Sequence, residues 1–262
     1  MLNAVAPVKP FAPYVGGKRI LSKRIVQIIS SVDHHLYAEP CVGMGGVFFR
    51  RNSRPVVEVI NDLSTDIALV FRWLQRHYQQ VLDALRWQIC SRADFERLLA
   101  TDVSVLTELE RVARFIYLQR TAFGGKVINR NFGTTLTTSA RFDMTKLERM
   151  LLGVHQRLCG VDIENLPYDV FINKYDSPKT LYYIDPPYFG SEGYYGKAMF
   201  ARSDFETLAD LLARIKARFI LSLNDVPDTR RIFGAFNIEP VDLNYRISGK
   251  VTPAKEMIIS NI

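Results

Sequence analysis

Four consecutive residues, Asp185-Pro186-Pro187-Tyr188, place a carboxylate, two prolines and an aromatic ring directly after the apolar stretch Leu181 to Ile184. The apolar stretch predicts a buried strand, and open α/β sheets bind their ligands at the carboxyl ends of their strands. The prolines fix the backbone and leave carbonyl groups free to accept hydrogen bonds. A carboxylate and a carbonyl can each accept one N–H of an aromatic amino group, which directs the nitrogen lone pair at an electrophilic methyl group. The pattern therefore predicts chemistry on the exocyclic amino group of a base, with Tyr188 stacked on a base removed from its duplex. The alternative is a proline-rich turn with a helix-capping aspartate.

A loop that contains glycines follows an earlier predicted strand, Leu36 to Ala38. Its sequence is Glu39-Pro40-Cys41-Val42-Gly43-Met44-Gly45-Gly46. Glycines in such a loop let a ligand approach the backbone closely. Their spacing differs from the Gly-x-Gly-x-x-Gly pattern that nicotinamide and flavin enzymes prefer. A helix is expected to begin at Val47.

An acidic residue, Asp62, ends the next apolar run, Val56 to Ile60. A strand, a glycine loop, a helix, a second strand and an acid in this order are typical of a βαβ unit. At such a position the carboxylate can accept hydrogen bonds from both hydroxyls of a ribose. It can also cap the helix that is expected to follow, and the two roles are compatible.

A pair of glycines followed by a lysine lies near the N-terminus, in Tyr14-Val15-Gly16-Gly17-Lys18. A helix is expected over Gly17 to Ser30, because its isoleucines and leucine fall on one face. Backbone N–H groups and a lysine at the start of a helix can bind a negatively charged group. The alternative is an ordinary connection from a loop to a helix.

The hydrophobic periodicity changes along the chain. It is mainly helical from about Leu69 to Leu158, except for an irregular stretch over Phe123 to Ser139 that is rich in glycine, asparagine, threonine and basic residues. We interpret this part as an insertion with a functional loop. Strands then return, and the segments expected are strands over Thr180 to Ile184, Phe219 to Leu223 and Glu256 to Ser260, with a helix over Ser203 to Ala217. The alternation predicts an α/β fold with a doubly wound sheet and an antiparallel last strand.

Composition narrows the class of protein. The 262 residues carry a net charge of +7 and a pI of about 9.3, which suits a polyanionic partner. No apolar run is long enough for a transmembrane helix, and the N-terminus does not resemble a secretory signal. The three cysteines form neither a disulfide framework nor a metal pattern, and the four histidines show no ligand spacing. We therefore expect a cytoplasmic protein that binds no metal and no membrane.

Taken together, these segments resemble the DNA adenine methylase family, which is typified by the bacterial GATC methylases. The resemblance covers nearly the whole chain in the family's order. The segments that carry it are Pro13 to Lys18, Glu39 to Gly45, Asn61-Asp62, Arg114 to Gly125, Asp185 to Tyr188, Ser222-Leu223-Asn224 and Glu256 to Asn261.

The resemblance implies a Rossmann-like methyltransferase sheet that uses S-adenosylmethionine to methylate N6 of adenine in double-stranded DNA, with the target base flipped out of the duplex. It implies a catalytic domain formed by residues 1–68 and 160–262, and a target-recognition region over 69–159. The implied catalytic residues are Asp185, Pro186 and Tyr188. The residues expected to bind the methyl donor are Tyr14, Gly16, Gly17, Lys18, Glu39, Pro40, Gly43, Gly45, Asp62 and Asp185.

The irregular loop is the expected DNA-binding element. Basic side chains in and beside it could meet phosphates, while asparagines could contact base edges. The sequence departs from the family here, because Phe123-Gly124-Gly125 replaces Phe-Asn-Gly and the longer hairpin of the GATC enzymes is missing. We therefore expect relaxed or very short target recognition. The stretch Tyr188 to Tyr195 is more similar to phage and prophage members of the family. The candidate DNA-binding residues are Arg120, Lys126, Asn129, Arg130 and Asn131, with Arg141 nearby.

Three alternatives remain at this point. An N4-cytosine or RNA methyltransferase would share the donor site and the amino-group chemistry. A methyltransferase of glutamine side chains would carry Asn-Pro-Pro-Tyr in place of Asp185-Pro186-Pro187-Tyr188. A catalytically silent DNA-binding regulator would have no need of this motif. The biological role, whether protection from restriction, regulation or evasion of phage defence, stays open.

Overall fold

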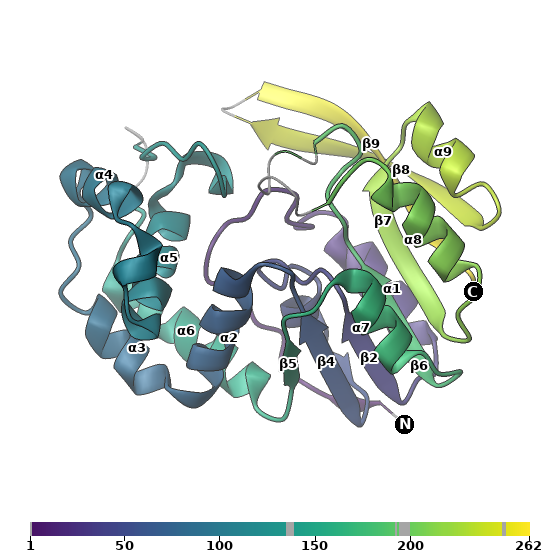
Figure 1. The fold of residues 1–262 in the computed structure, drawn as a ribbon, viewed down its shortest axis with the longest axis horizontal. Helices are drawn as coiled ribbons and strands as arrows, with labels where there is room; N and C mark the ends of the chain where they lie inside the picture. Colours follow the sequence, from purple (N-terminus) through teal and green to yellow (C-terminus); the bar gives the residue numbers. More distant parts are fainter. Residues whose placement is uncertain (1, 135–138, 192, 194–199, 248–249) are drawn as a thin grey trace.

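A seven-stranded sheet organises the chain, with strand order β5-β4-β2-β6-β7-β9-β8 (Figure 1). The computed structural model describes residues 2–134, 139–191, 193, 200–247 and 250–262. The strands are β2 (Leu36–Glu39), β4 (Val57–Asn61), β5 (Asp162–Glu164), β6 (Thr180–Ile184), β7 (Arg218–Asn224), β8 (Asn237–Ile247) and β9 (Lys250–Ser260). The first five of these pair in parallel, and β9 pairs antiparallel with both β7 and β8. The predicted α/β fold with an antiparallel last strand is confirmed.

The order of the strands creates a place for a ligand. From β2 the chain moves outward through β4 to β5, and it then returns to β6 on the other side of β2. Connections on the two sides of β2 therefore diverge at the carboxyl ends of β2 and β6. In open α/β sheets this divergence leaves a crevice in which ligands bind.

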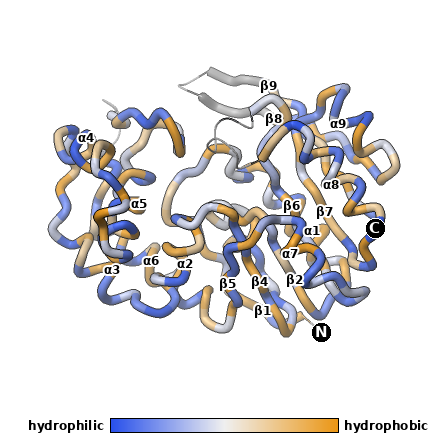
Figure 2. The backbone as a smooth tube through the Cα atoms, in the orientation of Figure 1, coloured by the Kyte–Doolittle hydropathy of each residue, from blue (hydrophilic) through white to orange (hydrophobic). Residues whose placement is uncertain are grey.

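Helices cover both faces of the sheet, so its inner strands are apolar on both sides. Neighbouring residues of one strand belong to different cores: Tyr37 packs on one face and Ala38 on the other, and Tyr183 and Tyr182 divide in the same way. The helix α1 (Ser22–Ser31) lies on one face, and α7 (Tyr168–Tyr175), α8 (Asp204–Leu212) and α9 (Pro227–Ile232) pack on the other (Figure 1). Hydrophobic segments follow the central strands in Figure 2, as this arrangement requires.

A group of helices joins β4 to β5 and occupies the end of the molecule beside β5 (Figure 1). Its members are α2 (Thr65–Arg76), α3 (Tyr78–Leu85), α4 (Arg92–Ala100), α5 (Glu108–Thr121) and α6 (Met144–Leu158), with a 3₁₀ turn η2 (Val103–Val105). A capping box starts α5, because Thr107 accepts from the backbone of Glu110 while the Glu110 side chain accepts from the backbone of Thr107. The helical periodicity expected over Leu69 to Leu158 is thus observed, and the division into a catalytic domain and a recognition region stays a prediction.

A buried ion cluster ties these helices to the sheet. Arg157 of α6 donates two hydrogen bonds to Glu58 of β4, at 2.7 and 2.6 Å. Arg51 contacts the same carboxylate at 2.9 Å, and its guanidinium lies 3.6 Å from the centre of the Tyr37 ring. All three charged side chains are buried, so the pairing keeps α6 at a fixed position against β4.

Two helices differ from expectation at their starts. The prediction of a helix from Val47 is wrong, because only a 3₁₀ turn, η1 (Phe48–Arg50), forms there. This single turn buries the rings of both Phe48 and Phe49, after which Arg51 is extended. The helix α1 begins at Ser22, later than predicted, because Gly16 has a φ of 75° and the chain turns again before the helix.

The C-terminal part also differs in its detail. The predicted strand over Glu256 to Ser260 belongs to β9, which lies inside the sheet between β7 and β8. The edge strand is β8, which the sequence did not predict. A two-stranded sheet of β1 (Asn3–Ala4) and β3 (Ser53–Arg54) was also not expected. Within the described residues, no helix is long and apolar enough to cross a membrane.

Candidate active site

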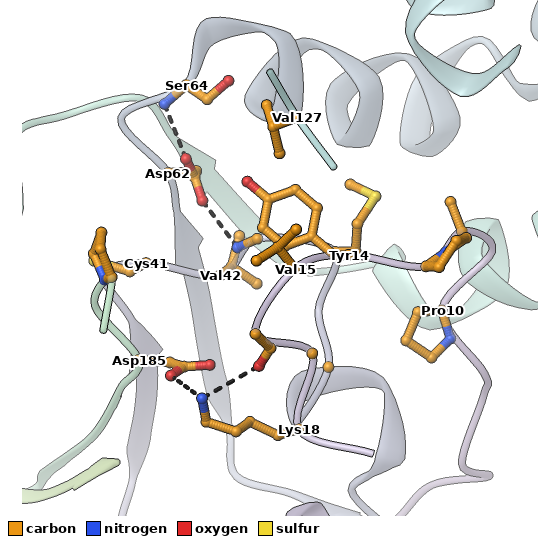
Figure 3. A pocket seen from close by; sticks show the side chains of 18 of the residues that line it. Pro10, Tyr14, Val15, Lys18, Cys41, Val42, Asp62, Ser64, Val127 and Asp185 are labelled. Atoms are coloured by element: carbon orange, nitrogen blue, oxygen red, sulfur yellow. Dashed lines mark hydrogen bonds and ion pairs between the residues drawn. The ribbon is translucent and has the colours of Figure 1, made fainter. Parts of the chain in front are cut away.

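A cavity of about 550 Å³ lies at the carboxyl ends of β2, β4 and β6. The strand ends contribute the loop after Glu39, Asp62 and Asp185, and the N-terminal segment from Pro10 to Arg19 closes another side. Figure 3 shows Tyr14, Asp62 and Asp185 around this space. The three motifs that are far apart in the sequence thus meet in one place, as their positions at strand ends predict.

Lys18 joins the N-terminal segment to the predicted catalytic motif. Its ammonium lies 2.6 Å from Oδ1 of Asp185 and donates a hydrogen bond of 2.9 Å to the hydroxyl of Tyr188. It also donates to the carbonyl of Gly16 at 3.2 Å, within the turn that the glycine permits (Figure 3). The Lys18 side chain is only 1% exposed, whereas that of Asp185 is 22% exposed. Both residues line the cavity, but the carboxylate keeps more exposed surface than its counter-ion.

Burial raises the pKa of Asp185 to about 6, against an ordinary value of 3.8. The positive charge and the hydrogen bond of Lys18 act in the opposite direction, and the nearby carboxylate of Glu256 raises the pKa further. At neutral pH Asp185 is therefore mainly ionised, because the ion pair with Lys18 offsets part of the cost of desolvation. An ionised carboxylate accepts hydrogen bonds and donates none.

The glycine loop brings the backbone close to the aromatic wall of the cavity. Gly43 has a φ of 51°, and a Cβ at this position would lie 3.1 Å from the ring of Tyr14. The N–H of Gly43 donates to Oδ2 of Asp62 at 2.9 Å. Gly45 has no room for a side chain, because a Cβ there would clash with the ring of Phe49. Gly45 therefore shapes the loop, and it is not among the residues that line the cavity.

Asp62 accepts backbone hydrogen bonds just before α2, and its predicted role as a ribose ligand stays a prediction. One carboxylate oxygen accepts from Gly43, and the other accepts from the N–H of Ser64 at 2.9 Å, at the start of α2. Burial raises its pKa to about 6, while these two backbone hydrogen bonds lower it. A carboxylate has about four lone-pair sites, so two remain for hydroxyl groups of a ligand in the cavity. Asp62 lines that cavity, as a ribose-binding residue would.

Glu39 does not line the cavity, although its neighbour Pro40 does. The Glu39 side chain is 1% exposed and accepts a hydrogen bond of 2.6 Å from the hydroxyl of Tyr37. Burial raises its pKa to about 8, which the Tyr37 hydrogen bond counteracts. In this structure the buried Glu39 side chain is bonded to Tyr37 of the same strand. Its predicted contact with a ligand stays a prediction.

Two arginines expected at DNA phosphates are engaged inside the protein. The guanidinium of Arg120 donates to the carbonyls of Phe11 and Arg141, both at 2.9 Å. Arg130 donates to Gln119 Oε1 at 3.0 Å and to the carbonyl of Lys126 at 3.1 Å. Burial lowers the pKa of Arg130 to about 10. In this conformation both side chains hold the loop in place, and the exposed members of the predicted set are Lys126, Asn129 and Asn131.

The loop is fixed more firmly than its composition predicts. Backbone hydrogen bonds close it between Phe123 and Asn131 at 2.8 Å and between Gly133 and Thr121 at 2.8 Å. The fully buried Gln119 donates to the carbonyls of Gly125 at 2.8 Å and of Pro13 at 2.7 Å. The loop up to Thr134 thus shares its supports with the wall of the cavity. Residues 135–138, 192 and 194–199 lie outside the described residues, and the segment compared with phage enzymes includes residues 192, 194 and 195 of these.

Several residues of the site were not found by sequence reasoning. Asn61, next to Asp62, is buried and connects two loops, because its Nδ2 donates to the carbonyls of Pro40 at 2.8 Å and Leu166 at 3.0 Å. The apolar walls of the cavity come from segments without any motif, and only their place in the fold identifies them: Pro10, Val127, Met150, Tyr168 and Phe200. In the described part of the chain, no group of three or more histidine, cysteine or acidic side chains is arranged to hold a metal ion.

This arrangement contains the groups that are required for methyl transfer to an amino group. Apolar and aromatic walls suit a flat heterocycle, and Asp62 suits the hydroxyls of a sugar. An ionised carboxylate, Asp185, and the proline carbonyls beside it suit an N–H donor at the far side of the same cavity.

Comparison with known proteins agrees with this chemistry. Residues 14–247 match the D12 class of N6 adenine-specific DNA methyltransferases. The chain is similar to type II methyltransferase M1.LlaDCHI of Lactococcus lactis subsp. cremoris, with 22% identity over 275 residues that cover 97% of this chain and 95% of the relative. It is 26% identical to type II methyltransferase M.MjaIII of Methanocaldococcus jannaschii over 208 residues, which cover 69% of each chain. It is 21% identical to type II methyltransferase M.CviBI of Paramecium bursaria Chlorella virus NC1A over 258 residues, which cover 93% of this chain and 95% of the relative.

We expect the Asp185 carboxyl group to titrate near pH 6, protonated below and ionised above. Carbon-13 NMR of protein labelled at the aspartate carboxyl carbons measures this, and Asp185→Asn identifies the signal. Lys18→Met should raise the pKa, because it removes the charge that favours the ionised form. Lys23→Met, on the exposed face of α1, should leave it unchanged. A titration of Asp185 near 3.8 in the unaltered protein would contradict the burial argument.

Proposed function

Since the chain belongs to the D12 class of N6 adenine-specific DNA methyltransferases, we propose that S-adenosylmethionine is its methyl donor and that Asp185, Pro186 and Tyr188 bind the target adenine. One observation carries the proposal. The accessible carboxylate of Asp185 lies in the same cavity as the ribose-type acid Asp62 and the glycine loop around Gly43. A donor and an acceptor that bind there would be side by side.

The cavity suits an adenosine-containing donor. Asp62 has lone pairs left for both ribose hydroxyls, and Gly43 leaves the backbone open to a close approach beside Tyr14. When bound, the donor supplies an electrophilic methyl group. The chain's own contribution is to hold that group at the end of the cavity where Asp185 lies.

The acceptor side works through hydrogen bonds. The amino nitrogen of adenine is a poor nucleophile, because its lone pair is delocalised into the ring. Asp185 and the carbonyl of Pro186 would each accept one of its N–H bonds and let the nitrogen become more tetrahedral. Lys18 favours the ionised form of the carboxylate before the transfer, since its own ammonium is buried against it. The proton that nitrogen loses as it gains the methyl group would pass first toward Asp185.

We expect Asp185→Asn to lower the rate of N6-methyladenine formation by about two to three orders of magnitude, because the amide is no longer an anionic acceptor. Mass spectrometry of nucleosides from digested duplex DNA measures the product. Asp176→Asn is the matched control, since Asp176 accepts backbone N–H groups of Lys216 and Ala217 far from the cavity. N4-methylcytosine as the only product, or more than about a tenth of the rate left in Asp185→Asn, would contradict the assignment.

A second prediction concerns the donor. Asp62→Ala should weaken S-adenosylmethionine binding by about tenfold or more, because charge-assisted hydrogen bonds contribute about 1.5–3 kcal/mol each. The maximal rate at saturating donor should change little, since the ribose lies away from the transferred methyl group. Asp66→Ala, in the first turn of α2 and paired with Arg111, is the control. Titration calorimetry that finds equal donor affinity in Asp62→Ala and the unaltered protein would leave Asp62 with its capping role alone.

The surface that meets the DNA backbone differs from the one that the sequence suggested. Arg120 and Arg130 have internal partners, so we assign phosphate contacts to exposed cations at the rim. Lys9 and Arg19 line the cavity, and Lys9 also borders a neighbouring hollow with Lys23 of α1. Among the residues that the structure describes, no carboxylate forms an ion pair with Lys9, Arg19 or Lys23. Such uncompensated charges beside the site suit a phosphodiester backbone.

The combined substitution of Lys9, Arg19 and Lys23 by alanine should weaken duplex binding and make it less dependent on salt. Each lost phosphate contact reduces the slope of log K against log[salt] by about 0.9. Fluorescence anisotropy with a labelled duplex at several salt concentrations measures this slope. The control replaces Lys179, Arg214 and Lys216, three exposed cations near the amino-terminal edge of the sheet, with alanine. Equal slopes in the two triple variants would exclude the rim as the DNA surface.

We also propose that the target base is flipped out of the duplex and that the target sequence is short. Because Asp185 lies in a cavity, an adenine in a stacked duplex would have to leave the helix to meet it. The short loop from Lys126 to Asn131 offers few side chains to the bases, so we retain the expectation of a short target.

A further inference from the structure

The strand β7 runs beside the motif that the proposed function uses, and two of its residues contact that motif. We infer that Ser222 and Asn224 are positioning residues that hold the two ends of the segment from Asp185 to Phe189. The inference rests on the proposed function, because it assigns these residues to the same reaction. Neither residue lines the cavity, and each forms hydrogen bonds to the segment itself, so we assign both a positioning role.

The segment needs such support because of its own composition. Pro186 and Pro187 have no N–H groups, so the backbone between Asp185 and Tyr188 has lost donors that would otherwise fix it. It has also left the sheet, since β6 ends at Ile184. Residues two apart on a strand point to the same face, so Ser222 and Asn224 can reach the segment together from β7.

Ser222 holds the carboxylate at the first end. Its hydroxyl is fully buried and donates to Oδ1 of Asp185 at 3.3 Å, while the hydroxyl of Tyr183 lies 2.8 Å from it. A serine hydroxyl has one proton, so if that proton points at Asp185, Tyr183 must donate to Ser222. Lys18 contacts the same oxygen, Oδ1, at 2.6 Å.

This leaves the second oxygen of Asp185 for the substrate. Both contacts, from Lys18 and from Ser222, are to Oδ1. Among the described residues, no hydrogen-bond donor contacts Oδ2. Ser222 and Lys18 thus fix the rotation of the carboxylate and keep one oxygen available.

Asn224 holds the other end through two hydrogen bonds. Its Oδ1 accepts from the N–H of Phe189 at 2.9 Å, and its Nδ2 donates to the carbonyl of Phe189 at 3.0 Å. The pair fixes the backbone directly after Tyr188. Asn224 is itself held, because Thr229 at the start of α9 donates to its carbonyl at 3.0 Å. Only an amide side chain can accept and donate in this way.

The chain offers a matched control at the opposite end of the same strand. Asn261 accepts from the N–H of Phe219 at 2.8 Å and donates to the carbonyl of Ala217 at 3.0 Å. The two asparagines therefore make the same kind of contact to the backbone, one beside the motif and one far from it. Any general loss of stability from such a contact should affect both alike.

The experiment compares Asn224→Asp with Asn261→Asp in the full-length protein. Aspartate keeps the acceptor and loses the donor, with almost no change in size. We expect the kcat of Asn224→Asp to fall by about tenfold to a hundredfold, as for a displacement of a reacting group, with donor affinity within about twofold of the unaltered protein. Asn261→Asp should keep its kcat within about twofold. Thermal unfolding of both variants controls for stability.

Ser222→Ala adds an independent readout. Loss of a hydrogen bond to the ionised carboxylate should move the acidic limb of the kcat/KM profile for DNA to higher pH, measured at saturating donor. An unchanged kcat in folded Asn224→Asp, or an unchanged pH profile in active Ser222→Ala, would overturn the assignment of that residue. If the unaltered protein forms no N6-methyladenine, the proposed function has failed instead, so the two failures can be told apart.

Discussion

The arrangement of the site depends on the buried ammonium of Lys18 and on the anion that it needs beside it. A lysine with almost no exposed surface requires an anion beside it, because an unpaired charge is strongly disfavoured away from water. Asp185 supplies that anion, and Tyr188, 170 residues from Lys18 in the sequence, supplies a hydrogen-bond acceptor. The contact ties the N-terminal segment to the end of β6.

The parallel sheet determines where that contact can occur. Because β2, β4 and β6 are parallel neighbours, the glycine loop, Asp62 and Asp185 emerge at one edge. Each acid is then held by a different kind of group: Asp62 by backbone N–H groups, and Asp185 by side chains. Burial raises the pKa of both to about 6. Two carboxylates in one cavity can thus serve different partners.

The group of helices between β4 and β5 shares its supports with the wall of the cavity. Gln119 of α5 donates to Pro13 in the cavity wall and to Gly125 in the loop, and Gly125 lies so close that a Cβ would be 2.8 Å from the backbone of Pro13 and Tyr14. The ion cluster of Arg51, Glu58 and Arg157 fixes α6, which belongs to the same group of helices, to β4 of the sheet. The part of the chain expected to meet DNA and the part expected to hold the donor therefore form one frame.

The sequence by itself determined the elements whose signal is local. The apolar run before Asp185 predicted β6 at its observed bounds, and the glycine and acid positions predicted which loops would meet, because strand ends fix the position of whatever follows them. Only the tertiary structure decided how side chains were used. Arg120 and Arg130 have the residue type of phosphate ligands, yet nearby carbonyls and Gln119 engage them, and Glu39 lies beneath its loop. The helix expected at Val47 is replaced by a turn that buries two phenylalanines. Arg120 is bonded to Phe11, 109 residues away in the sequence, and no local pattern of residues contains such a partner.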